Sequence, residues 1–183
     1  MNEKVFEPFP ILETERIFLR QIKDDDIPGI YRFYSGRDTL KNIARDFYTT
    51  KEQAVEKVNL LQDNYEEKKG IWWAFTQKPK DEFIGFGGLF EISKESNKAE
   101  IGYGLLPEYW GNGIMSEVVE KLIDFGFNEM KLHKIYGRIT PGHIASIRVL
   151  GKFGFRKEGV LRDDEFAQNR YFDTAIYSLI KNI

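Results

Sequence analysis

The sequence predicts a single α/β domain with a mixed, mostly antiparallel sheet of about seven strands, flanked by about four helices. Segments with strand and helix periodicity follow in the order strand, two helices, three strands, helix, strand, helix and two strands. At 183 residues, 42% of them hydrophobic, the chain has the size and apolar content of one domain. No internal repeat or linker divides it, so we treat 1–183 as one unit.

The chain begins with a lead-in, a strand and a helix. Residues 1–11 contain prolines and no periodicity, which predicts a loose segment. Residues 16–22 alternate as a strand does. Asp24-Asp25-Asp26 then place acids where the positive end of a helix dipole favours them, before an apolar helix face that Gly36 ends. We read these acids as capping groups and not as metal ligands, because neighbouring side chains on a helix diverge.

A second helix and two strands follow an irregular segment over 37–49. Thr50 and Gln53 form a capping-box pattern at the start of this helix. Residues 71–76 and 82–91 have strand character. The glycine-rich stretch of 82–91 has no helix signal after it, so we expect a kinked central strand and not a nucleotide loop.

The second half alternates strands and helices. A strand over 99–105 leads through a glycine-bearing turn into the most amphipathic helix of the chain. A later helix ends at Gly154, a residue suited to the left-handed position after a helix. The apolar face of the first helix contains Met115, Val118, Val119, Leu122, Ile123 and Phe127, and the remaining strands are expected at 134–139, 155–166 and 170–181.

The turn between Leu105 and Ser116 is a candidate anion site. The first N–H groups of a helix lack internal partners, and glycines let a phosphate approach the backbone closely. A dinucleotide-binding fingerprint needs Gly or Ala where Ser116 stands, and the Gly-Lys-Ser/Thr of a P-loop is missing.

Composition excludes several other functions. A net charge of −2 and a pI near 5.8 argue against nucleic-acid binding. Cysteine is absent, and two histidines are too few for a histidine-rich metal site, so we expect no metal. No apolar run approaches the roughly 18 residues of a membrane span, and the N-terminus lacks a secretion signal, which predicts a cytoplasmic protein without membrane contact.

The run from Pro107 to Glu117 resembles the GNAT acetyltransferase superfamily, in particular its RimJ/RimL-like N-acetyltransferase branch. The short superfamily pattern falls on Trp110, Gly113 and Met115; Trp and Met there depart from the superfamily but are usual in that branch. The resemblance extends over about 12–180 through further segments at 140–146, 149–155, 158–163 and 170–179.

This resemblance implies a single GNAT-fold domain that transfers an acetyl group from acetyl-CoA to an amine. The strand before the loop would splay from the next one, and the backbone of Leu105 and Leu106 would pair with pantetheine. His143 stands where the family has Asn, whose side chain contacts the pantetheine amide or the thiolate. Trp110 and the loop N–H groups of Gly111, Asn112, Gly113, Ile114, Met115 and Ser116 would bind the cofactor's pyrophosphate.

Two residues are candidates for catalysis. Without cysteine there is no acetyl-cysteine intermediate, so the amine would attack acetyl-CoA directly in a ternary complex. Glu100 matches a family glutamate and could act as base, or be a solvent-facing strand residue. Ser146 matches the family serine near the leaving sulfur, and could also cap its helix. Ser146 and His143 are three residues apart, but the strand-turn-helix context of a nucleophilic serine is missing.

The lead acceptor implied by the resemblance is the N-terminal amine of a ribosomal protein. Tyr103 and Tyr171 are expected to touch it, and Gly104, where many relatives carry a large aromatic, suggests a wider or differently shaped pocket. The alternative is a small-molecule amine such as a polyamine, an antibiotic or an amino acid derivative. An acidic cleft, with 163–165 as a source of charge, would favour polyamines. A non-catalytic CoA-binding module is a third possibility, and the protein could be a monomer or a homodimer through its C-terminal edge strands.

Overall fold

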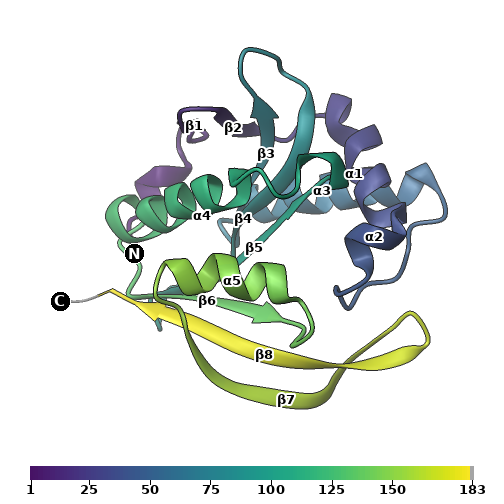
Figure 1. Ribbon diagram of the computed structural model, residues 1–183. Helices are drawn as coiled ribbons and strands as arrows, with labels where there is room; N and C mark the ends of the chain where they lie inside the picture. The colour runs from purple at the N-terminus through teal and green to yellow at the C-terminus, as the bar shows by residue number, and fades with distance from the viewer. Residues whose placement is uncertain (182–183) are drawn as a thin grey trace.

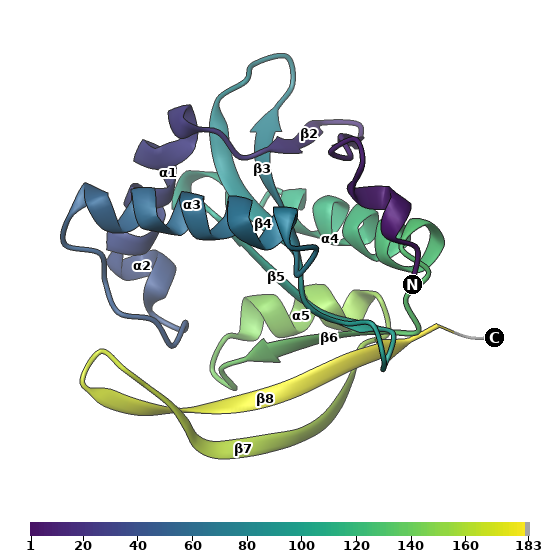
Figure 2. The ribbon, with the colours of Figure 1, turned by 180° about the vertical axis from the view of Figure 1, so that it is seen from behind.

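The computed structural model describes residues 1–181, and one twisted sheet runs through them (Figures 1 and 2). The sheet has eight strands in the order β1-β2-β3-β4-β5-β6-β8-β7. The pair β5–β6 is parallel and the other pairs are antiparallel. The strands are β1 (Leu12–Glu13), β2 (Ile17–Gln21), β3 (Ile71–Gln77), β4 (Phe83–Ser93), β5 (Lys98–Leu105), β6 (Lys134–Ile139), β7 (Arg156–Ala167) and β8 (Arg170–Ile180).

Helices cover both faces of the sheet. In Figure 1, α4 and α5 lie in front of it, and the reverse view in Figure 2 shows α1 and α3 on the opposite side. Because strand side chains alternate between the faces, Trp73 and Phe75 pack in the core under α4, whereas Ala74 packs in the core under α1 and α3. The helices are α1 (Ile27–Ser35), α2 (Arg37–Leu40), α3 (Lys51–Glu66), α4 (Ile114–Asp124) and α5 (Ile144–Lys152).

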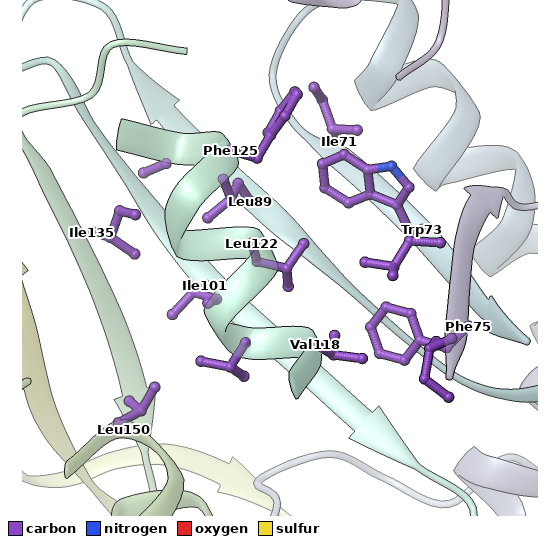
Figure 3. Packing of buried hydrophobic residues seen from close by; sticks show 14 of the residues in the cluster. Ile71, Trp73, Phe75, Leu89, Ile101, Val118, Leu122, Phe125, Ile135 and Leu150 are labelled. Atoms are coloured by element: carbon purple, nitrogen blue, oxygen red, sulfur yellow. The ribbon is translucent and has the colours of Figure 1, made fainter. Parts of the chain in front are cut away.

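The larger core lies between α4 and the middle of the sheet (Figure 3). Val118 and Leu122 of α4 are fully buried there, as the amphipathic pattern predicts. Phe125 packs edge-on against Trp73 with ring centroids 5.3 Å apart. The indole N–H of Trp73 donates to the Pro10 carbonyl at 2.7 Å, so this buried polar group has a partner.

The predicted fold is confirmed, with two additions. The segment 1–11 is not uniformly the loose lead-in that we expect, because Glu3–Phe6 form a 3-10 turn with Phe6 buried. After it, the two-residue strand β1 pairs with β2. Both pieces are too short to show a hydrophobic period, so no pattern in the sequence indicates them. The short α2 likewise forms inside the segment 37–49, which the sequence predicts to be irregular.

Local signals mark several element ends correctly. The Thr50–Gln53 capping box is present, with the Gln53 side chain accepting from the Thr50 N–H at 3.1 Å. Gly154 follows Phe153, the C-cap of α5, and has φ +81, the left-handed conformation that favours glycine after a helix. Asp26 caps its turn by accepting from the Lys23 N–H at 2.9 Å, and it also pairs with Arg20. Within residues 1–181 we find no helix whose length and apolar character would suit it to spanning a bilayer.

Candidate active site

The parallel strands β5 and β6 separate in the middle of the sheet. Their pairing runs from Lys98–Lys134 to Glu100–Tyr136 and stops there. Beyond this point β5 continues paired with β4, and β6 continues paired with β8, so a wedge opens between them (Figure 1). The edge of β5 that points away from β4 therefore faces this wedge after Glu100 and not a neighbouring strand.

The turn after β5 presents free backbone donors beside the wedge. Gly111 and Gly113 have φ +78 and +77, which glycine adopts without a steric cost, and Gly113 is the N-cap of α4. The N–H groups of Ser116 and Glu117 bond to the Gly113 carbonyl. Among residues 1–181, no carbonyl accepts from the N–H groups of 111–115. A Cβ on Gly111 would meet nothing within 4 Å, so open space adjoins these donors.

Two of the backbone groups that we expect to bind pantetheine already have hydrogen-bond partners within the protein. The Leu106 N–H donates to the Ile84 carbonyl at 2.9 Å, and the Leu105 carbonyl accepts from the Trp110 indole at 2.8 Å. Successive residues in a strand direct their N–H groups to opposite sides, so the Leu105 N–H faces the wedge. The Leu105 N–H is therefore the backbone donor of this pair that remains available to pantetheine. The indole of Trp110 holds the turn against β5 through its hydrogen bond to the Leu105 carbonyl.

Charged side chains from other elements hold the turn between β5 and α4 in position. The Arg16 backbone N–H donates to Glu117 at 3.0 Å, and its side chain donates to the same carboxylate at 2.7 Å. Arg16 also donates to the Asn112 carbonyl at 3.1 Å. On the other side, Lys152 of α5 donates to the Ser116 hydroxyl at 2.9 Å. The sequence does not indicate this role of Arg16, because Glu117 lies 101 positions further along the chain.

A cavity of about 490 Å³ lies next to the wedge. It brings together four predicted site residues: Glu100 and Tyr103 of β5, and His143 and Ser146 at the start of α5. Tyr171 does not line it; this side chain is exposed and packs against Phe166 near the β7–β8 turn. Trp72 and Phe90, aromatic residues that could line an acceptor cleft, also lie in the cavity wall. The wall residues that the sequence did not indicate include Phe33, Arg45, Lys57, Tyr136 and Arg138.

Glu100 is a half-buried carboxyl group in this cavity. Burial raises its pKa to about 7, and the positive charge of Arg138 opposes part of that shift. Tyr136 lies beside it on β6, and the nearby Glu100 charge adds to the effect of burial in raising the tyrosine's pKa. A carboxyl group with a pKa near neutrality is able to accept a proton from an amine at physiological pH.

Ser146, Tyr103 and His143 form a connected group. The Ser146 hydroxyl lies 3.0 Å from the Tyr103 hydroxyl. His143 is the N-cap of α5, where its Nδ1 accepts from the Ser146 backbone N–H at 3.4 Å. Burial lowers the His143 pKa, which favours neutral imidazole with Nε2 as its donor. Since Nδ1 faces the Ser146 N–H and the hydroxyl meets Tyr103, the three groups do not form an activated Ser–His pair.

Phe33 of α1 takes the space beside Gly104. A Cβ built on Gly104 would lie 2.4 Å from the Phe33 ring, which forms part of the cavity wall. The missing side chain at Gly104 is thus replaced by an aromatic ring from another element. The pocket is differently shaped at this point, and the missing side chain does not widen it.

Sequence and structure comparisons identify relatives. The pattern that describes the Acetyltransferase (GNAT) domain matches residues 16–156. The chain is 37% identical over 173 residues to the uncharacterized N-acetyltransferase YoaA of Bacillus subtilis (strain 168), covering 94% of this chain and 98% of the relative. It is 35% identical to the uncharacterized N-acetyltransferase p20 of Bacillus licheniformis, covering 93% and 96%.

Solved structures share the fold. A ribosomal-protein-S5-alanine acetyltransferase from Vibrio fischeri superposes with a TM-score of 0.82 at 25% identity, covering 94% of this chain and 97% of the other. A spermidine N-acetyltransferase from Vibrio cholerae, in complex with CoA and spermine, has a TM-score of 0.80 at 22% identity, covering 91% and 96%. These two proteins act on different acceptors, so the shared fold does not select one.

Proposed function

This chain belongs to the GNAT acetyltransferase family, and from that premise we propose that it acetylates a primary amine with Glu100 as general base. The protein is an acetyl-CoA-dependent acyltransferase. The observation that carries the proposal is the single cavity in which Glu100, with its raised pKa, meets Tyr103, Ser146 and the wedge. The run from Pro107 to Ser116 further supports the RimJ/RimL-like branch.

The proposed cofactor site uses backbone groups. The N–H groups of 111–115 would hold the pyrophosphate, with the space beside Gly111 open for it, whereas the Ser116 N–H, which we also expected there, is bonded to the Gly113 carbonyl. The Leu105 N–H would face the thioester oxygen, where a fixed donor stabilises developing negative charge. His143 Nε2 would donate to pantetheine, because Nδ1 is occupied by the helix cap.

The proposed reaction has one covalent step, since the chain contains no cysteine to carry the acetyl group. The amine nitrogen attacks the thioester carbon; the N–C bond forms and the C–S bond breaks. The proton lost by the amine passes to Glu100, directly or through water. The sulfur leaves as a thiolate, which the Ser146 hydroxyl, held by Tyr103, hydrogen-bonds.

The lead acceptor is the N-terminal amine of a protein. The run from Pro107 to Glu117, which resembles the RimJ/RimL-like N-acetyltransferases, supports this choice. The second candidate is a small amine, supported by the more distant spermidine N(1)-acetyltransferases of Vibrio cholerae and Escherichia coli, each 24% identical to this chain. The acidic stretch 163–165, which could favour a polyamine, lies in β7 and is neutralised in part, because Arg138 pairs with Asp164 and Glu165 at 2.7 and 2.8 Å.

Thiol release from acetyl-CoA across a panel of acceptors tests the function. The panel contains peptides with free Ala, Ser or Met N-termini, spermidine, an aminoglycoside and free amino acids. We expect Glu100→Gln to lose roughly 10²–10⁴-fold in kcat with acetyl-CoA binding retained. Glu95→Gln, which removes an exposed carboxylate from the β4–β5 turn, is the control. Full turnover in Glu100→Gln would refute the base assignment, and CoA binding without any turnover would favour the non-catalytic module.

A further inference from the structure

Two cations face the cavity from outside the sheet. Lys57 projects from α3, and Arg45 follows α2; both line the cavity wall. Within residues 1–181, Lys57 has no ion pair or hydrogen bond, and its ammonium lies 5.5 Å from the centre of the Trp72 ring. Lys57 is half-buried and belongs to the cavity lining. We call Lys57 and Arg45 the basic corner.

A hydrogen bond and an ion pair fix the position of Arg45 in the basic corner. Gln168, in the β7–β8 turn, donates its side-chain N–H to the Arg45 carbonyl at 3.0 Å. The Arg45 guanidinium lies 3.5 Å from Glu165, which is shared with Arg138. Burial, and then the positive charge of Arg45, lower the Lys57 pKa to about 8. Two like charges on one wall, one of them without a carboxylate partner, form a binding site for an anion.

The cavity lining also contains carboxylates, with Arg138 near Glu100. Glu100 of β5 and Glu91 of β4 lie on paired strands, where Phe90 and Glu100 are direct partners. The negative charges of both glutamates contribute to raising the Tyr136 pKa, after the larger effect of burial, so both lie near this tyrosine. Aromatic rings, among them Trp72 and Phe90 stacked at 4.8 Å, line the same cavity.

We infer that the acceptor is an amine that also carries a carboxylate, with the carboxylate bound by Lys57 and Arg45 and the amine directed at Glu100. This inference rests on the proposed function, because Glu100 marks the reacting end. An apolar or aromatic body would contact the rings between the two ends. A polyamine has an ammonium at each end, so one of its charges would face the basic corner, where like charges repel. The carboxylate could belong to a small molecule or to an acidic side chain of a peptide N-terminus.

Matched probes that differ only in charge test this inference. The small-molecule pair is 4-(aminomethyl)benzoate and 4-(aminomethyl)benzamide, and the peptide pair is Ser-Glu-Ala-amide and Ser-Gln-Ala-amide. Binding of each probe, and of spermidine, is measured by calorimetry in the presence of CoA. The chains are the wild type, Lys57→Met, Arg45→Gln and the control Lys51→Met. Lys51 is an exposed lysine on the same helix and does not line the cavity.

We expect the wild type to bind the carboxylate member of at least one pair about tenfold more tightly than its amide. Lys57→Met should reduce this preference to about twofold, and Arg45→Gln should reduce it in part, whereas Lys51→Met keeps it. The pair that shows the preference identifies the source of the carboxylate.

Four results would overturn the inference. They are equal binding within each pair, no binding of either carboxylate probe, a preference that survives both Lys57→Met and Arg45→Gln, or tighter binding of spermidine than of the carboxylates. Thiol release from acetyl-CoA is measured on the same samples. A carboxylate preference without thiol release from any acceptor would refute the proposed function while supporting the charge assignment of the cavity.

Discussion

Glu100 and Glu158 are carboxylates on strands of the same sheet whose surroundings shift their pKa values in opposite directions. Burial raises the pKa of Glu100 to about 7, whereas hydrogen bonds from Lys134 and Ser178 lower that of Glu158. The difference lies in position: Glu100 borders the cavity at the point where β5 leaves β6, and Glu158 is exposed on β7. At the scale of single residues, the local environment therefore decides which carboxylate is able to act as a base near neutral pH.

The Glu100 pKa predicts how activity depends on pH. If Glu100 is the base, kcat/KM should rise with pH through a midpoint near 7, because only the deprotonated carboxylate accepts a proton. The measurement is the pH profile of thiol release in wild type and in Glu100→Gln. The variant should lose this rising limb, and an unchanged midpoint in its residual activity would contradict the assignment.

The same shift predicts an effect on stability with a defined sign. A carboxyl group whose folded pKa lies above its unfolded value, here about 7 against 4.5, binds more protons in the folded state between these values. The free energy of unfolding of wild type should therefore fall relative to Glu100→Gln as pH rises from 4.5 to 7, and the difference should then stay constant. Denaturant unfolding at several pH values measures it, and a difference independent of pH would show that Glu100 is not perturbed.

At the scale of elements, the turn between β5 and α4 depends on a contact that no local pattern shows. The glycines give the turn its shape, with φ +78 at Gly111 and +77 at Gly113. Its position is fixed by Arg16, just before β2, through Glu117 and the Asn112 carbonyl. Since pyrophosphate would bind to backbone N–H groups, their orientation should matter more than any one side chain in the turn.

We predict that Arg16→Gln raises the KM for acetyl-CoA about tenfold and changes kcat little, because the contact orients the cofactor site and not the reacting atoms. Steady-state kinetics with varied acetyl-CoA measures this effect. Glu117→Gln should act in the same way, and the double variant should be no worse than either single one. Arg156→Gln, which changes an exposed arginine of β7, serves as the control. Additive losses in the double variant would show that Arg16 and Glu117 act separately.

At the scale of the whole molecule, the C-terminal hairpin closes the cavity against the segment after α2. Gln168 donates its side-chain N–H to the carbonyls of Leu40, Ile43 and Arg45, and its backbone N–H to Asp46 at 2.7 Å. In Figure 1 the β7–β8 hairpin reaches from the α5 side of the sheet towards α2. Segments more than 120 residues apart in the chain thereby form one wall.

A shorter side chain at position 168 tests whether the Gln168 hydrogen bonds hold the hairpin against the segment after α2. Gln168 has φ +52, a backbone conformation that Asn tolerates. The Gln168→Asn side chain is one methylene shorter, so its amide should no longer reach the three carbonyls, and little backbone strain is added. We expect a loss of about 1–2 kcal/mol in the free energy of unfolding, a lower melting temperature by a few degrees, and a raised KM for the acceptor. Asn169→Gly, at the neighbouring turn position, should leave the acceptor KM unchanged. An unchanged acceptor KM in Gln168→Asn would show that the hairpin does not shape the cavity.

Much of the fold and part of the candidate site could be predicted from the sequence. The capping box at Thr50, the end of α5 at Gly154 and the apolar face of α4 depend on neighbours within a few residues, so they are visible locally. Lys57 also had a signal that we did not use: it lies three residues after Ala54 and four before Leu61, both buried. Arg45 had none, because it lies in an irregular segment. The roles of Glu100, Ser146 and Tyr171, and the monomer or homodimer state, stay predictions.

The sequence by itself determined the order of the elements, the glycine-bearing turn and the family, because these depend on residue spacing and on runs of adjacent residues. Only the tertiary structure decided which side chains share the cavity, that Phe33 fills the space at Gly104, that Arg16 holds the turn, and that Lys57 and Arg45 line the same cavity as Glu100. The physical reason is that the cavity walls come from both helical layers and from the strands on each side of the wedge. Their contacts, burial and pKa values arise from packing between segments far apart in the chain, which no local pattern encodes.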